Sequence, residues 1–292
     1  MKILISGTSG LIGSEIKQRL QARGDEVIAL SRVAREGAIA WPEGSTLNPS
    51  DLEGFDAVIH LAGENVGGRW TKAKKQAIYD SRVQRTRELC QALAQTTNPP
   101  QAFLCASATG IYGDRGGEEI TEESAPGTGF LADVCRDWEA SCTPLENKAR
   151  LINLRFSVVF DKSGGVLKKM LLPFQFGLGG PLGDGLQYVS WISLEDATRA
   201  VIYLLDNNHN GAFNITAPQP VRNREFVQEL GRVLHRPAII PAPAFALRLL
   251  LNEFADEALL SSARVLPKRL LDSGFQFEHE TLPETLQAIL RR

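Results

Sequence analysis

The fold of this chain is decided at its N-terminus, where Lys2-Ile3-Leu4-Ile5-Ser6 is followed directly by Gly7-Thr8-Ser9-Gly10-Leu11-Ile12-Gly13. The first five residues form a run rich in β-branched side chains, which is typical of a strand. Residues 11–23 then carry apolar side chains at helical spacing, and residues 26–30 are apolar again. This order predicts a βαβ unit that opens the chain.

The three glycines of this run have separate roles. Gly7 permits a tight turn, Gly10 lets backbone N–H groups approach a pyrophosphate at the helix N-terminus, and Gly13 allows close helix-to-strand packing. Such spacing also occurs in plain turns, but its position behind a strand favours a dinucleotide-binding fingerprint. We therefore expect a cofactor to bind at Gly7, Ser9, Gly10, Leu11, Ile12 and Gly13.

The end of the second predicted strand indicates which dinucleotide binds. A site that prefers NAD places an Asp or Glu there, on the ribose 2′-hydroxyl, but this chain has Ser31-Arg32. Ser31 can donate to a 2′-phosphate, and Arg32 can pair with that phosphate and stack on the adenine. The sequence therefore favours NADP(H), the alternative for Arg32 being a solvated surface residue.

The rest of the chain continues the α/β alternation. Strands are predicted at residues 56–61, 102–106 and 150–159, with helices at 72–94 and 127–147 between them. This predicts a Rossmann fold with a doubly wound parallel sheet. A strand-like segment at 188–192 and predicted helices follow, at 197–205, 221–234, 245–251 and 282–290.

We accordingly expect two lobes. Residues 1–163, completed by about 186–216, would form the NADP-binding Rossmann domain. Residues 164–185 and 217–292 would form a smaller, mostly helical C-terminal lobe that caps the substrate.

The amino-acid composition argues against several classes of partner and ligand. The 32 Lys and Arg against 34 Asp and Glu leave a formal net charge of -2, which argues against nucleic acid as the main partner. No apolar run approaches the roughly 18 to 20 residues of a membrane-spanning helix. The 4 Cys form no C-x-x-C pair and, without a signal-peptide pattern, are expected to be reduced thiols of a cytoplasmic protein. The 4 His are scattered and predict no metal site.

Several further motifs resemble the extended short-chain dehydrogenase/reductase superfamily, and within it the atypical YfcH-type epimerase family. The superfamily motifs are the glycine run, His60-Leu61-Ala62-Gly63 and Ser107-Ala108-Thr109-Gly110-Ile111-Tyr112-Gly113-Asp114. Those similar to the narrower family are Gly63-Glu64-Asn65, Arg69-Trp70, Ser81-Arg82, Leu178-Gly179-Gly180-Pro181-Leu182-Gly183, Trp191-Ile192, Pro267-Lys268-Arg269-Leu270 and Gly274-Phe275. The resemblance covers essentially the whole chain.

The resemblance implies roles for individual residues. Leu61, Ala62 and Gly63 would pass beneath the adenosine and ribose, although Leu61 and Ala62 could equally pack in the core. Arg82 would reach the cofactor from the long helix, and Val158 would lie near the nicotinamide.

One part of the family pattern is missing. Catalytic members use a Tyr-x-x-x-Lys pair in which the lysine lowers the pKa of the tyrosine, so that the phenol exchanges a proton with a substrate hydroxyl. If Glu139 aligns with the acid that commonly follows this pair, Leu131 and Cys135 occupy the two positions. A leucine cannot transfer a proton.

Two residues remain as candidate catalytic groups. Ser107, at the end of its strand, could hydrogen-bond a substrate carbonyl or hydroxyl, or could be a structural hydroxyl. Tyr112 could be a substitute acid, although packing within its loop is the favoured alternative. Otherwise the proton must pass through Glu64 or water.

The sequence thus supports two functions. The first is an NADP(H)-binding, epimerase-like oxidoreductase acting on an unidentified hydroxyl or carbonyl compound, with a nucleotide sugar as one candidate. The second is a catalytically silent NADPH-binding sensor or regulatory protein, which the loss of the Tyr-Lys pair would permit. A purely structural module conflicts with the fingerprint and with Ser31-Arg32. The oligomeric state is left open.

Overall fold

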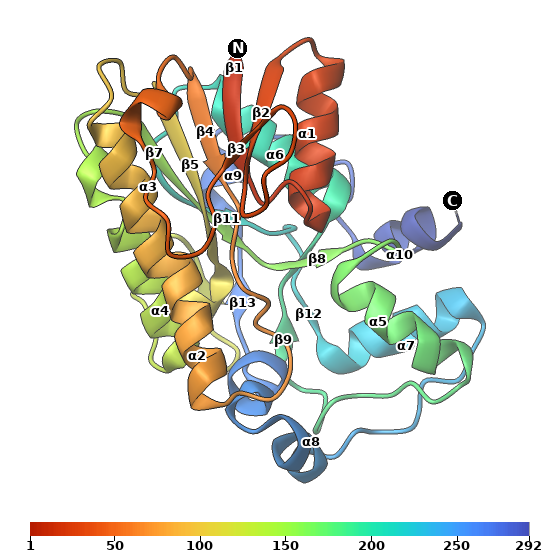
Figure 1. Ribbon diagram of the computed structural model, residues 1–292. Coiled ribbons are helices and arrows are strands. Elements are labelled where there is room, and N and C mark those ends of the chain that lie inside the picture. Colours follow the sequence, from red (N-terminus) through yellow and green to blue (C-terminus); the bar gives the residue numbers. More distant parts are fainter. Residues whose placement is uncertain (292) are drawn as a thin grey trace.

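Seven parallel strands form the central sheet of the computed structural model, which describes residues 1–291 (Figure 1). Their order is β11-β7-β5-β4-β1-β2-β3, and every neighbouring pair is parallel. The strands are β1 (Lys2–Ser6), β2 (Glu26–Ser31), β3 (Ala38–Ala40), β4 (Ala57–His60), β5 (Ala102–Ala108), β7 (Arg150–Phe156) and β11 (Gly211–Ile215). The predicted doubly wound Rossmann fold is confirmed.

Helices cover both faces of the sheet (Figure 1). On one face lie α1 (Leu11–Ala22) and α6 (Leu194–Asp206), and on the other α3 (Arg85–Ala94) and α4 (Phe130–Ala140), with α2 (Lys72–Tyr79) leading into α3. Successive side chains of β1 point to opposite faces of the sheet, since Ile3 and Ile5 belong to one buried cluster and Leu4 belongs to the other. Both faces of the sheet are therefore buried, as parallel sheets require.

A smaller lobe lies beside the carboxyl ends of these strands (Figure 1). Its helices are α5 (Gly165–Gln175), α7 (Asn223–Leu234), α8 (Ala244–Leu251) and α10 (Leu282–Arg291), whereas α9 (Lys268–Asp272) packs against the sheet beside β11. Its short strand pairs are β8 (Val158–Phe160) with β10 (Trp191–Ser193), β9 (Tyr188–Val189) with β12 (Val221–Arg222), and β6 (Glu119–Ile120) with β13 (Arg264–Val265). Phe160 stacks between Trp191 and Phe226 at the centre of a separate apolar core.

The division of the chain into lobes at the predicted boundaries stays a proposal. Phe160, Trp191, Phe226 and Leu286 pack together away from the sheet, which supports it. The region after residue 263 also returns to the sheet, because Leu270 packs in the cluster that contains the first strand.

Four predicted elements differ from the structure. The strand-like segment expected at 188–192 is two strands, since β9 pairs with β12 and β10 pairs with β8. The helix expected at 72–94 contains a π-helical turn at Asp80–Gln84 between α2 and α3. The helix expected at 127–147 begins only at Phe130, because Gly129 has a φ of 111° that is incompatible with a helix. The strand expected at 150–159 divides, since β8 leaves the sheet and pairs with β10.

No helix in the described part of the chain is long and apolar enough to cross a bilayer.

A buried chain of hydrogen-bonded side chains connects β1 and β4 to α3. Ser6 Oγ accepts hydrogen bonds from the N–H groups of Leu61 and Ala62, and lies 2.7 Å from His60 Nδ1. Its hydroxyl proton is therefore directed at Nδ1, and the ring proton sits on Nε2, which donates to Thr86 Oγ1 at 3.0 Å. Burial lowers the pKa of His60 to about 4, so this imidazole is neutral.

The burial of His60 in this hydrogen-bonded chain predicts a loss of folding stability in mild acid. The unfolded chain protonates His60 near pH 6.5 whereas the folded protein resists protonation down to about 4, so stability falls as the pH drops through this window. The loss attributable to His60 is about 2 kcal/mol between about pH 7 and about pH 5. Urea unfolding at the two pH values measures it.

The substitution His60→Gln should flatten this pH dependence although it lowers the stability at neutral pH. The matched control is His235→Asn, at an exposed histidine whose left-handed φ of 54° suits asparagine. The interpretation fails if His60→Gln loses as much stability on acidification as the unmodified protein.

Candidate functional site

A cleft of about 580 Å³ opens where the carboxyl ends of β1, β5 and β7 face the smaller lobe. Its wall on the sheet side is formed by the glycine run and by residues of β5 and β7, including Ser107 and Phe156. The opposite wall comes from β8, β9 and the segment around Ala258. Parallel α/β sheets place their sites at this edge.

The glycine run forms a bare backbone cradle at one end of the cleft. Gly7 has a φ of 77°, and a Cβ there would lie 2.9 Å from the carbonyl carbon of Leu61. A Cβ on Gly13 would lie 2.3 Å from the oxygen of Gly7, so no side chain fits. No described side chain caps the N-terminus of α1 at Gly10, which leaves its N–H groups available to an anion.

The predicted cofactor residues divide into two groups. Those that line the cleft are Gly7, Gly10, Leu11, Ile12, Gly13, Leu61, Arg82 and Val158. The others, Ser9, Ser31, Arg32, Ala62 and Gly63, lie outside this lining. A Cβ on Gly63 would lie 3.1 Å from Arg82 Cζ, so the guanidinium lies directly over this glycine.

Arg82 is the basic residue of the cradle. Its Nη1 donates to the backbone oxygen of Glu64 at 2.9 Å, and the guanidinium lies over the Trp138 ring. Burial lowers the pKa of this guanidinium, which has no carboxylate partner among the described residues. Arg82 belongs to the π-helical turn at Asp80–Gln84, a feature frequent at functional sites.

Cations also surround the edge of the cradle where β2 ends. Arg32 is exposed there, and the carboxylate of Glu64 pairs with Lys74 at 2.6 Å. Lys74, and after it Arg32, hold the pKa of Glu64 below its usual range. Glu64 is therefore an ion-paired carboxylate.

Ser107 belongs to a buried polar network behind the cleft. Its hydroxyl donates to Glu139 Oε1 at 2.7 Å, and Arg155 binds both oxygens of the same carboxylate at 2.8 Å. Arg155 Nη1 also donates to the Tyr112 hydroxyl at 2.8 Å, which in turn donates to Asn214 Oδ1 at 2.8 Å. The network runs from α4 through β7 to β11.

Only one of the two candidate catalytic residues faces the cleft. Ser107 lines it, whereas Tyr112 is fully buried and absent from the lining. The Tyr112 phenol has both a donor and an acceptor partner, and burial raises its pKa. Tyr112 is thus placed as a packing and hydrogen-bonding residue, the alternative that its sequence context favoured.

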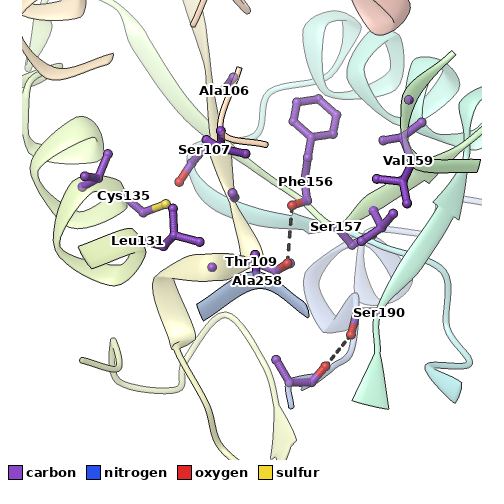
Figure 2. A pocket seen from close by; sticks show the side chains of 18 of the residues that line it. Ala106, Ser107, Thr109, Leu131, Cys135, Phe156, Ser157, Val159, Ser190 and Ala258 are labelled. Atoms are coloured by element: carbon purple, nitrogen blue, oxygen red, sulfur yellow. Dashed lines mark hydrogen bonds between the residues drawn. The ribbon is translucent and has the colours of Figure 1, made fainter. Parts of the chain in front are cut away.

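Leu131 and Cys135 occupy one face of α4, next to the strand end that carries Ser107 (Figure 2). Burial raises the pKa of Cys135 to about 12, so its thiol is protonated. Neither side chain replaces the proton-transfer chemistry of a Tyr-Lys pair.

The structure adds a residue that the sequence did not indicate. Glu257 lines the cleft and accepts hydrogen bonds from the N–H groups of Phe130 (2.9 Å) and Leu131 (2.7 Å), at the start of α4. It lies in a second π-helical turn, Ala255–Leu260. No local pattern could have identified it, because its partners are 126 and 127 positions away.

Comparison with known families gives two matches along the chain. The profile of the NAD dependent epimerase/dehydratase family matches residues 3–216. A domain of unknown function, DUF1731, matches residues 242–289. The chain is similar to epimerase family protein Mb2239 of Mycobacterium bovis, with 40% identity over 290 residues that cover 97% of this chain and 96% of that protein.

Two solved structures are also similar. The human epimerase family protein SDR39U1 (isoform 2), crystallised with NADPH, has a TM-score of 0.93 and 32% identity, with 100% of both chains covered. The nucleoside-diphosphate sugar epimerase from Corynebacterium glutamicum has a TM-score of 0.82 and 32% identity, covering 99% of this chain and 58% of that one.

The buried network predicts a large effect of Arg155→Met. The substitution leaves the Glu139 carboxylate without its partner, and breaking a buried ion pair costs about 3 to 5 kcal/mol of unfolding free energy. Chemical denaturation measures the loss. The matched control is Arg136→Met, which removes an exposed pair with Asp133 and should cost less than about 1 kcal/mol. Equal losses for the two variants would contradict this account.

Proposed function

Since the chain belongs to the NAD dependent epimerase/dehydratase family, as its motifs indicated, we propose that it is an NADP(H)-dependent, epimerase-like oxidoreductase acting on a hydroxyl or carbonyl compound. The observation that carries the proposal is one continuous cleft that joins the uncapped N-terminus of α1 to the hydroxyl of Ser107. The human relative crystallised with NADPH supports the choice of cofactor.

The residues of the cradle fit a dinucleotide phosphate. The N–H groups at the start of α1 would bind the pyrophosphate, which approaches closely because Gly7, Gly10 and Gly13 carry no side chain. Ser31 and Arg32 would bind the 2′-phosphate, and Leu61, Ala62, Gly63 and Arg82 would contact the adenosine and ribose. Val158 would lie beside the nicotinamide, which exchanges a hydride with the substrate carbon when bound.

We assign proton exchange with the substrate to Ser107. Because its own hydrogen is donated to Glu139 Oε1, its free lone pairs accept a hydrogen bond from a substrate hydroxyl. A proton that leaves this hydroxyl passes to Ser107 Oγ as the serine proton passes to Glu139 Oε1. Arg155 holds the carboxylate in position for that transfer through two hydrogen bonds. Glu139 and Ser107 would thus replace the absent Tyr-Lys pair.

A second function is favoured by one specific observation. The α4 positions facing Ser107 carry Leu131 and a protonated Cys135, neither of which exchanges protons near neutral pH. A protein that binds NADPH and reports its level to a partner would need no such groups.

Transfer of deuterium separates the two functions. NADPH deuterated at C4 of the nicotinamide is incubated with the protein and a pool of small carbonyl compounds and sugar nucleotides, and NMR detects the label. We expect deuterium in one class of product, with a rate reduced about 100-fold in Ser107→Ala and unchanged in the exposed control Ser50→Ala. Tight NADPH binding without any transfer would favour the sensor.

The proposed 2′-phosphate site predicts a change of cofactor preference. Arg32→Ala should raise the dissociation constant for NADPH about tenfold or more while that for NADH stays constant, because an Arg–phosphate pair is lost. Titration followed by nicotinamide fluorescence measures both constants. Arg35→Ala, at another exposed arginine of the same loop, is the control. Equal weakening of both nucleotides by Arg32→Ala would place the 2′-phosphate elsewhere.

A further inference from the structure

The part of the cleft beyond the cradle is lined mainly by apolar side chains. Leu131, Phe156 and Val159 lie around it, and Ala258 closes the opposite side (Figure 2). Val134 and Leu259 extend the same surface. Apolar walls of this kind contribute binding energy for hydrocarbon and little for a hydrated, charged ligand.

Charge is scarce in this lining. Among the described residues that line the cleft, the charged side chains are Arg82 and Glu257. Arg82 lies over Gly63, on the side of the proposed cofactor site, and one of its nitrogens is occupied by the Glu64 carbonyl. The negative charge among these described lining residues is therefore the carboxylate of Glu257.

Two more arginines lie near the cleft but outside its lining. Arg222 and Arg264 stack on the Tyr188 ring, with Cζ at 4.7 and 5.4 Å from its centroid. Arg222 donates to the Leu186 carbonyl, and Arg264 pairs with Glu119 at 3.0 Å. Tyr188 lines the cleft, whereas the two guanidiniums do not.

The serine and threonine hydroxyls that line the cleft already donate hydrogen bonds to protein acceptors. Ser107 donates to Glu139, Thr109 to the Phe156 carbonyl and Ser157 to the Ile215 carbonyl. Ser190 donates to the Ala263 carbonyl and Ser261 to that of Glu257. These hydroxyls consequently offer a ligand their oxygen lone pairs, which accept hydrogen bonds.

Glu257 is a strong acceptor in the same region. Each of its carboxylate oxygens accepts one backbone N–H, from Phe130 or Leu131, and each retains lone-pair capacity for a ligand. No ion pair with a described Lys, Arg or His neutralises this carboxylate. A negatively charged phosphate beside it would be repelled, whereas a hydroxyl group would donate to it.

We infer that the substrate is an uncharged, largely apolar molecule that carries, besides the oxygen that reacts at Ser107, a hydroxyl group that donates a hydrogen bond to Glu257. The inference rests on the proposed function, because the cradle end of the cleft is assigned to the cofactor. It disfavours the nucleotide sugar that the family resemblance suggested, since two phosphates would have to lie beside hydroxyls that already donate to protein acceptors and beside the Glu257 carboxylate. Glu257 is assigned as the residue that determines this specificity.

The probes for this inference are menthol, its ketone menthone and UDP-glucose. Menthol and menthone have the same apolar skeleton, but the ketone has no hydroxyl proton to donate. Titration calorimetry, with and without saturating NADPH, should give a menthol affinity about tenfold or more above that of menthone. UDP-glucose should bind more weakly than either compound.

Three variants locate the interaction. Glu257→Gln should reduce the preference for menthol over menthone to less than about threefold, because the charged acceptor becomes neutral. Asp256→Asn, which changes the neighbouring exposed carboxylate that pairs with Arg248, should leave the preference intact. Ala258→Phe preserves the Glu257 contacts with α4 and should weaken both compounds equally by filling the cleft.

The results distinguish this inference from the proposed function. If NADPH binds and UDP-glucose binds more tightly than menthol, or menthone binds as tightly as menthol, the inference is wrong and the cofactor proposal stands. If NADPH fails to bind, the proposed function is wrong, and the menthol preference in the protein alone still decides the inference. A preference that survives Glu257→Gln, whatever Ala258→Phe does, would remove Glu257 from the assignment and overturn it.

Discussion

The bidentate ion pair between Glu139 of α4 and Arg155 of β7 lies where the elements behind the cleft meet. It fixes the direction of the Ser107 hydroxyl, because Glu139 accepts the hydrogen bond from that hydroxyl, and it holds the Tyr112 phenol through Nη1 of Arg155. Charges that are largely withdrawn from water are tolerated when their hydrogen-bonding groups have partners. The geometry of the candidate site thus depends on a pair that touches none of the proposed ligands.

A second constraint acts at the other end of the cleft, at the glycine run. The absence of side chains there allows α1 to pack closely on β1 and also leaves room for the proposed cofactor. Gly13 lets α1 approach β1 so closely that a methyl group would meet the Gly7 oxygen at 2.3 Å. This contact places the N-terminus of α1 at the edge of the sheet, where its N–H groups face the cleft. The position of the helix and the exposure of its N–H groups are therefore consequences of one close contact, so the same fingerprint bears on both the fold and the proposed cofactor site.

The features predicted correctly from the sequence are those that depend on residues close together in the sequence. The first βαβ unit follows from the periodicity of residues 2–30, and the glycine spacing led to the cradle. Features that depend on distant partners were not accessible. Tyr112 is buried because it meets Asn214, 102 positions away, and Glu257 reaches the cleft through contacts with the start of α4. Propensity and periodicity contain no information about such pairs.

The π-helical turn that carries Arg82 has a consequence for how sequences of this kind can diverge. A π turn amounts to one extra residue within an α-helix, and each residue of an α-helix turns the following side chains by about 100°. Deletion of a single residue between Tyr79 and Arg85 would restore a regular helix and rotate one flank of it against the other. The basic group of the cleft would then depend on helix length as much as on residue identity. A one-codon deletion, with every side chain otherwise retained, could redirect Arg82 away from Gly63 and change what the cleft binds.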